Sequence, residues 1–275
     1  MLIGYNCARP TKENYSDFER KLISGLKDLA IDGLSLMVYG SYIRGDMDIG
    51  RSDIDAVLTF TDDVVIDKES LHEVGKVLHR ALKGNPVPFQ VSVTDLSTMR
   101  DGRFNTYDVS FKDYFEEEGR ILVGPDHRRH YSYELPTVSE QTPVRFNLRK
   151  SRIGLLFAEH HRNEDYESYL SNFMKTLNSV TRGSKQVLFF LDGTLRKNRF
   201  AAVDLVKELF PGIDAEPLVR IKKLYHDPSQ LDCLYKQPDN VMDLWNSTVT
   251  FFEQMIREYI RKVPKQPVLP DIFLK

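Results

Sequence analysis

Residues 39–45 read Tyr-Gly-Ser-Tyr-Ile-Arg-Gly, and residues 52–58 read Ser-Asp-Ile-Asp-Ala-Val-Leu. An apolar run leads into the first stretch, and the second continues as another apolar run. We therefore predict a strand, a turn and a second strand. Because residues i and i+2 of a strand face the same side, Asp53 and Asp55 are expected to project together where the second strand begins.

This pair of carboxylates suits a hard divalent cation. Mg²⁺ in particular is held by one or two carboxylates together with substrate phosphates. Gly40 has no Cβ, so its backbone can come close to a phosphate, and Ser41 adds a hydroxyl and a backbone N–H. The alternative is a surface hairpin, with Asp53 capping a turn and Asp55 in solvent. That alternative leaves unexplained why two carboxylates open an apolar strand.

In Gly40, Ser41, Asp53 and Asp55 the chain resembles the DNA-polymerase-β-like nucleotidyltransferase superfamily. The motif of that superfamily is an apolar strand, Gly-Ser, a spacer, and Asp-x-Asp or Asp-x-Glu on the next strand. Many members also carry a basic residue and a glycine shortly after the Gly-Ser pair, as this chain does. The combination is more specific than Asp-x-Asp alone, because strand, turn and strand must come in the right order.

The resemblance implies an enzyme that transfers a nucleoside monophosphate, AMP by default, from ATP or another nucleoside triphosphate to an acceptor hydroxyl. It implies that Asp53 and Asp55 are catalytic and bind Mg²⁺, as two ions roughly 3.5–4 Å apart. Gly40 and Ser41 would hold the β- and γ-phosphates. Arg44 could neutralise charge on the triphosphate, or it could be a solvated turn residue.

Three further residues, Ser52, Gln90 and Lys175, complete the nucleotide site that we predict. Lys175 is included because a lysine or arginine from the helical domain of the resembling enzymes often reaches the triphosphate. The alternative for Lys175 is a solvated helix face.

The third predicted strand departs from the pattern of the superfamily, which usually places a third carboxylate there. On the matching face this chain has Gln90 and Ser92, and Asp95 has the parity of the opposite face. Glutamine cannot take a proton from a hydroxyl at neutral pH and is a poor Mg²⁺ ligand.

Three explanations of this departure stay open. The general base could come from the helical domain, where the candidates are Glu159, which we assign as catalytic, Glu164 and His160. One metal ion held by Asp53 and Asp55 could suffice. The protein could also be a degenerate relative that binds nucleotide without turnover.

The sequence predicts an α+β fold whose first part, residues 1–135, is a nucleotidyltransferase catalytic domain with a small mixed sheet and flanking helices. The first helix is expected to begin with a capping box of Ser16 and Glu19 and to end at Gly33. The later elements that we predict are strands at 34–39, 54–60 and 87–93, helices at 70–83 and 107–118, and a closing segment at 119–126.

From about residue 136 helical periods dominate. We predict a helical substrate-binding domain at 136–263 and an extended, Pro-containing tail at 264–275. A catalytic domain followed by a helical bundle resembles the aminoglycoside and lincosamide (kanamycin-type) nucleotidyltransferases. The helices that we expect are 144–161, 166–182, 185–192, 201–210, 216–226 and 241–262, with breaks at glycines such as Gly183 and at prolines.

Composition limits the class of protein. The chain has 275 residues, 41% of them hydrophobic, with a net charge of −2 and a pI of about 6.4. The overall charge gives no support for a strongly basic nucleic-acid-binding surface. Two cysteines do not form a disulfide framework. We see no signal peptide or membrane span, and so expect a cytoplasmic protein.

The partners that we predict are a nucleoside triphosphate and a small-molecule acceptor. The acidic run 116–118 could attract a cationic acceptor such as an aminoglycoside. Transfer to a protein or a tRNA is the alternative. The wide apolar face around Phe251 is expected to be buried, although a homodimer that shares a cleft would be compatible with it.

Overall fold

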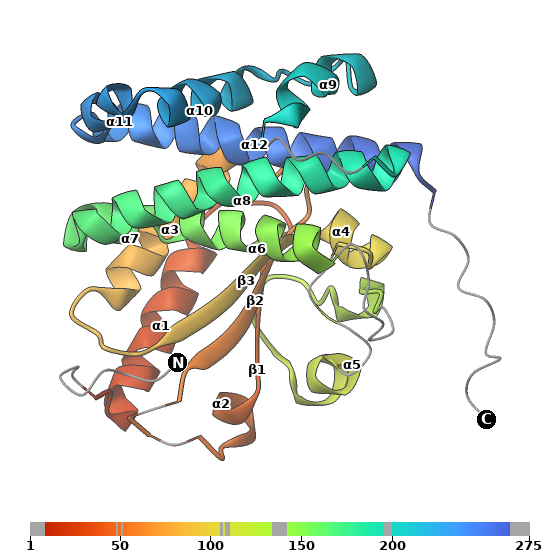
Figure 1. Ribbon diagram of the computed structural model, residues 1–275. Helices are drawn as coiled ribbons and strands as arrows, with labels where there is room; N and C mark the ends of the chain where they lie inside the picture. The colour runs from red at the N-terminus through yellow and green to blue at the C-terminus, as the bar shows by residue number, and fades with distance from the viewer. Residues whose placement is uncertain are drawn as a thin grey trace.

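The structure is a computed structural model, and it describes residues 9–47, 49–50, 52–104, 107, 111–133, 142–194 and 200–264. Its centre is a four-stranded mixed sheet in the order β3-β2-β1-β4 (Figure 1). β1 pairs antiparallel with β2 and with β4, whereas β2 and β3 run parallel. The strands are β1 Ser35–Tyr39, β2 Ile54–Phe60, β3 Phe89–Asp95 and β4 Arg120–Val123. The predicted α+β class is confirmed.

Helices flank the sheet and then make up the C-terminal part. Those among and around the strands are α1 Lys12–Lys27, α2 Ser41–Arg44, α3 Lys68–Leu82, α4 Leu96–Asp101, α5 Phe111–Asp113, the π-helix η1 Tyr114–Glu118 and the 3-10 helix η2 Arg128–His130. The C-terminal helices are α6 Thr142–Leu156, α7 Ala158–Glu164, α8 Tyr166–Asp192, α9 Ala201–Leu209, α10 Glu216–His226, α11 Pro228–Tyr235 and α12 Pro238–Lys262. In Figure 1, α6 and α8 lie above the sheet, and α12 lies beyond them with α9, α10 and α11 outermost.

The first helix begins earlier than predicted. Thr11 is its N-cap, because the side chain accepts from the Asn14 N–H at 3.4 Å while Asn14 Oδ1 accepts from the Thr11 N–H at 2.8 Å. The expected start at Ser16 was wrong, since Ser16 lies inside the helix and its Oγ donates to the Lys12 carbonyl. The reciprocal cap satisfies helix N–H groups that would otherwise lack partners.

The predicted helix break at Gly183 was also wrong. α8 continues through Gly183, where a Cβ would lie only 2.3 Å from the ring of Phe252 in α12. The glycine therefore permits a close approach of two long helices and does not end one. Two other boundaries differ: a break at Phe157 separates α6 from α7, and Pro228 opens α11, which we did not predict. Proline is well suited to the first turn of a helix.

The sheet and the helical part share one hydrophobic core. Leu58 and Val93 of the sheet belong to the same buried cluster as Leu148 of α6 and Phe252 of α12. The apolar face around Phe251 is part of this interior, with Phe251 only 1% exposed, so it offers no surface for a homodimer. The predicted domain boundary near 135 and almost all of the predicted tail lie outside the described residues.

A buried ionic network crosses the same junction. The Arg152 guanidinium of α6 donates to Asp95 Oδ2 at 2.8 Å and to Glu253 Oε1 at 2.9 Å, and Lys68 Nζ donates to the other oxygen of Glu253. Two cations thus face two carboxylates, which is the balance that burial of charge demands. The network joins β3, α6, α12 and the start of α3.

Within the described residues, none of the helices combines the length and the apolar character needed to cross a membrane.

Candidate active site

Three positions of the predicted site converge at one end of the sheet. Gly40 follows the last residue of β1, and Tyr39 pairs with Asp55 in the antiparallel register. On its other side, Asp55 pairs with Gln90 at the start of β3. The register therefore brings the Gly-Ser turn, the Asp-x-Asp segment and the start of the third strand to one edge.

Asp55 is half-buried, and its pKa is raised to about 6. Burial is the largest cause, followed by the negative charge of Asp53, and the Arg149 guanidinium partly opposes both. The aromatic side chains of Tyr39, Tyr107 and Phe115 lie on the same face of the sheet, with the rings of Tyr39 and Phe115 5.0 Å apart. These rings limit the solvation of the carboxylate.

The two carboxylates fit a divalent cation. Because Asp53 acts electrostatically on Asp55, two negative charges are held near each other in a partly dry site, where a cation between them is favoured. Among the described residues, no group of three or more His, Cys, Asp or Glu side chains is placed to hold a metal. Mg²⁺ tolerates such a sparse protein ligand set, because water and substrate phosphates supply its other ligands.

Gly40 lets the chain pass directly beside this carboxylate. Its φ is +81°, and a Cβ at this position would lie 3.2 Å from Asp55 Oδ2. Both the left-handed backbone and the tight contact favour glycine. Ser41 follows as the first residue of α2.

α1 holds both halves of the motif in place. The Tyr15 hydroxyl donates to the Ser52 carbonyl at 2.6 Å, and the ring of Tyr15 stacks on that of Tyr42 in α2, with centroids 6.1 Å apart. The Tyr42 hydroxyl in turn donates to Glu19 at 2.6 Å. The sequence analysis placed Ser52 at the nucleotide and did not foresee this support, because the partners are distant in sequence.

Arg44 is engaged by two carboxylates. Its Nη1 lies 2.9 Å from Glu118 Oε2, and its Nε lies 3.2 Å from Asp46 Oδ2. Glu118 belongs to the acidic run that we considered as an attractor for a cationic acceptor. In this structure the charge of Glu118 is matched by Arg44.

Arg149 of α6 is a site residue that the sequence analysis missed. Its charge lowers the pKa of both Asp55 and Tyr39, against the effect of burial, so it lies within electrostatic reach of the Asp55 carboxylate. A signal was present: Arg145, Arg149 and Arg152 follow the i, i+4, i+7 spacing of one helix face. Arg145 and Arg152 are buried, which shows that this face points inward.

The face of β3 toward the pair carries no carboxylate. Gln90 is exposed beside Asp55, and Ser92 is buried further along the strand. Asp95 lies on the opposite face, as its parity predicts, where Oδ2 accepts from Arg152 at 2.8 Å and Oδ1 from the Thr98 N–H at 2.6 Å. Asp95 is therefore occupied in the core.

The packing of Glu159 disfavours its assignment as the catalytic base, which stays a prediction. Glu159 Oε1 accepts from Asn163 at 3.2 Å, and its Cβ packs toward Gly75 of α3. α3 packs on the face of the sheet opposite to Asp55, together with Val38, Ala56 and Val91. The alternatives His160 and Glu164 are placed similarly: both lie against His79 of α3, at 3.4 Å and 3.9 Å.

Lys175 lies on α8 and lines the same cavity as Arg149. The cavity has a volume of about 450 Å³ and runs between α6 and α8. The structure thus brings one predicted nucleotide-site residue and one unforeseen arginine to a common space.

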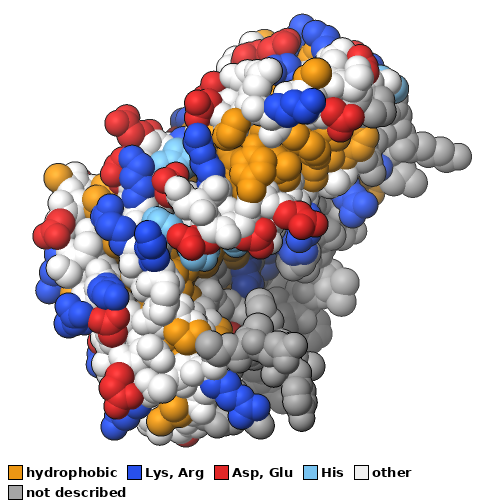
Figure 2. Space-filling view, turned by 90° about the vertical axis from the view of Figure 1, so that its left-hand side faces the viewer, with side chains coloured by type: hydrophobic (Ala, Val, Ile, Leu, Met, Phe, Trp, Pro, Cys, Tyr) orange, Lys and Arg blue, Asp and Glu red, His pale blue; other side chains and the backbone are white. Residues whose placement is uncertain are grey.

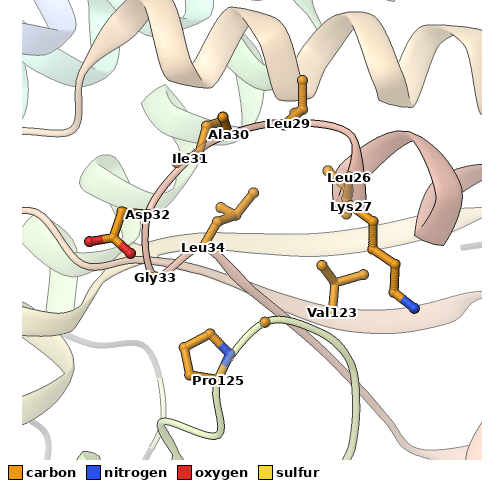
Figure 3. A pocket seen from close by; sticks show the side chains of 11 residues that line it. Leu26, Lys27, Leu29, Ala30, Ile31, Asp32, Gly33, Leu34, Val123 and Pro125 are labelled. Atoms are coloured by element: carbon orange, nitrogen blue, oxygen red, sulfur yellow. The ribbon is translucent and has the colours of Figure 1, made fainter.

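A second cavity lies at the other end of the sheet. It has a volume of about 490 Å³ and opens where α1 ends and β1 begins (Figure 3). Apolar side chains such as Leu29, Leu34 and Val123 line it, with Lys27 and Asp32 at its margin. Because Gly40 follows the opposite end of β1, this cavity is not part of the site.

Comparison with known families agrees with the geometry. Residues 19–122 match the nucleotidyltransferase domain family. This part of the chain is a nucleotidyltransferase domain. The match includes Gly40, Asp53, Asp55 and Gln90 and ends within β4. No curated protein matches the chain. The helical part is consistent with the predicted architecture, and its kanamycin-type resemblance stays a prediction.

Proposed function

We propose that the protein transfers a nucleoside monophosphate, with ATP as the default donor, to a hydroxyl of a small-molecule acceptor in the presence of Mg²⁺. The observation that supports this most strongly is the contact between Gly40 and the half-buried Asp55 carboxylate, within a nucleotidyltransferase domain. Because Gly40 has no Cβ, a phosphate and its cation can come close to both the backbone and this carboxylate.

In the proposed reaction the acceptor oxygen bonds to the α-phosphorus, and the bond from that phosphorus to the bridging oxygen breaks as pyrophosphate leaves. Asp53 and Asp55 would hold Mg²⁺, which neutralises phosphate charge and lowers the pKa of a bound hydroxyl. Gly40 and Ser41 would lie at the β- and γ-phosphates, with Ser52 and Gln90 nearby. Arg44 is paired with Glu118 and Asp46, so it is less available to the triphosphate than the sequence suggested.

The proton of the acceptor has no carboxylate to receive it on this face of β3 within the described residues. Of the three explanations for the missing carboxylate, a base on α7 is disfavoured by the packing of Glu159 and His160 against α3. We propose that the metal-bound pair suffices and that the proton passes to solvent water.

The face seen in Figure 2 gives no support for a nucleic-acid acceptor. On the face seen in Figure 2, Lys and Arg side chains are interspersed with Asp and Glu, and a hydrophobic patch lies at the height of the helical layers. A nucleic-acid interface would need a continuous basic stripe, and the described part of this face shows none.

The test is a comparison of the native chain with the double variant Asp53→Asn/Asp55→Asn. ATP binding is measured by calorimetry with and without Mg²⁺, and pyrophosphate release is measured with a panel of hydroxylated acceptors. We expect Mg²⁺-dependent binding in the native chain and none in Asp53→Asn/Asp55→Asn. The matched control, Asp232→Asn/Asp243→Asn, removes two exposed carboxylates from α11 and α12 and should bind normally. Equal binding by both double variants would contradict the proposal.

A further inference from the structure

The cavity between α6 and α8 has a strong charge asymmetry. Arg149 and Lys150 of α6 and Lys175 of α8 all line it, and its described lining contains no Asp or Glu. His161 also lines the cavity and brings no negative charge. Burial and the charges of His160 and Lys175 lower the pKa of its imidazole. The complete described lining is Arg149, Lys150, Ile153, Gly154, Phe157, His161, Asn172, Lys175, Thr176 and Ser179.

Two of these cations are not held in an ion pair by the described residues. Within the part of the chain that the structure describes, Arg149 and Lys175 form no hydrogen bond or salt bridge, although most other arginines near the junction do. Arg152, one helical turn from Arg149, is fully engaged by Asp95 and Glu253. The cavity therefore presents cations with no Asp or Glu among its described lining, and such clefts concentrate anions.

The cavity extends from Arg149, whose charge acts on Asp55, to the junction of α6 and α7. Phe157 lies at that junction, about two helical turns from Arg149, or about 12 Å at 1.5 Å per residue. There the rings of Phe157 and His161 stack at 6.0 Å, and Asn172 Nδ2 lies 3.1 Å from His161 Nδ1. A molecule in the cavity could thus place one end beside the carboxylate pair and the other on a fixed ring surface.

We propose that this cavity, which we call the α6–α8 cavity, is the acceptor site and that the acceptor carries an anionic group, a phosphate or a carboxylate. The proposal rests on the proposed function, because it identifies the acceptor of that reaction. A cationic acceptor such as an aminoglycoside would meet like charges at Arg149 and Lys175 without a carboxylate in the described lining to offset them. The ring surface would take an apolar or planar part of the same molecule.

The competing occupant of the α6–α8 cavity is the triphosphate of the nucleotide, which is also anionic. The two occupants differ in one respect. A bound triphosphate would keep a second anion away from Arg149 and Lys175, whereas an acceptor site would stay accessible to an anion when ATP is bound. A lysine-directed anionic probe distinguishes them.

The experiment uses pyridoxal 5′-phosphate on the full chain, with pyridoxal as the uncharged counterpart. The aldehyde and a lysine amine form an imine with loss of water, borohydride reduces the imine to a stable amine, and mass spectrometry locates it. We expect the phosphorylated probe to label Lys150 and Lys175 about 10-fold faster than pyridoxal does. Lys207, exposed on α9, should be labelled similarly by both. Saturating Mg²⁺ and ATP should leave the preference at Lys175 in place.

Two variants make the result specific. Arg149→Met should reduce the preference at Lys175, and Arg182→Met, which removes an exposed arginine of α8 outside the described cavity lining, should not. Equal labelling by both probes would overturn the proposal, and so would protection of Lys175 by ATP, which would assign the cations to the triphosphate. Failure of the proposed function would give a different result. Calorimetry would then show no ATP binding. A preference of Lys175 for the phosphorylated probe would, in that case, show an anion-binding cavity in a protein that does not transfer nucleotide.

Discussion

At Gly40 the main chain turns with a φ of +81° directly beside the Asp55 carboxylate. Gly45, at the other end of α2, has the same φ of +81° but no atom within 4 Å of a Cβ placed on it. The two glycines share a positive φ but differ in ψ, which is −155° at Gly40 and 11° at Gly45, where the backbone is in the left-handed α conformation. Gly45 is therefore a control for a positive φ at the same turn, and only Gly40 also has Asp55 beside it.

We predict that Gly40→Ala lowers the rate of pyrophosphate release about 100-fold, because a displaced carboxylate misplaces the reacting groups. Gly45→Ala should lose about 1 kcal/mol of stability through left-handed strain and keep most of its rate. Thermal unfolding and initial rates of both variants check this. Equal loss of rate in the two variants would show that the contact with Asp55 is not the cause.

The raised pKa of Asp55 gives a pH prediction with a definite sign. Burial disfavours the charged form in the folded state, so Asp55 costs stability above the unfolded pKa of about 3.9, and this cost builds up as the pH rises toward the folded pKa of about 6. Asp55→Asn should therefore melt about 2–4 °C higher than the native chain at pH 8 without Mg²⁺, after allowance for solvent screening.

The same reasoning predicts that this gain disappears near pH 4, where the folded carboxyl is already neutral. Melting curves of both chains at pH 8 and pH 4 in the presence of a chelator provide the check. Asp243→Asn, at an exposed position of α12, serves as the control for the loss of one charge. A gain in Asp55→Asn that is the same at both pH values would refute the electrostatic explanation.

At the level of elements, the sequence correctly predicted features that depend on residues close together in the chain. Strand β2 has the predicted bounds, 54–60, because its apolar run is bordered by polar residues. The Gly40 turn and the adjacent Asp53, Asp55 pair could also be predicted, since the motif lies within one strand–turn–strand unit. Gly183 was misread, because the reason for a glycine there is the ring of Phe252 on another helix. Arg149 was missed for the same reason: Asp55, the carboxylate on which its charge acts, is remote in sequence.

The support that α1 gives to the site leads to a prediction for Tyr15. Tyr15→Phe removes the hydrogen bond to the Ser52 carbonyl, which fixes the loop just before Asp53. We expect a loss of about 1 kcal/mol in the free energy of unfolding and a roughly 10-fold lower rate of pyrophosphate release, because the first carboxylate is less well positioned.

Tyr169→Phe is the matched control for Tyr15. Tyr169 is buried in α8, and its hydroxyl donates to the Pro238 carbonyl at 3.2 Å, far from the carboxylate pair. It should lose similar stability and keep its rate. If the rate of Tyr15→Phe also stayed native, α1 would have no role in positioning the site.

At the level of the whole molecule, the buried network around Arg152 decides whether the two parts of the chain behave as one. Its partners Asp95 and Glu253 come from the sheet and from α12, and both are fully buried. The helical part and the sheet also share a hydrophobic core. The predicted boundary between residues 135 and 136 would then separate two parts of the sequence that fold together.

We predict that Arg152→Met destabilises both parts together. Removing the guanidinium leaves two buried carboxylates without their cation, a change that costs about 3–5 kcal/mol. In a urea titration, fluorescence of Trp245 reports on α12, where it is the single tryptophan of the chain, and hydrogen exchange of β2 peptides reports on the sheet. Both midpoints should fall by the same amount.

Lys76→Met, which breaks an exposed pair with Glu73, should change the stability by less than about 1 kcal/mol. A shift at Trp245 without one in β2 would mean that the helical part unfolds alone, and the boundary near 135 would then separate two independent domains.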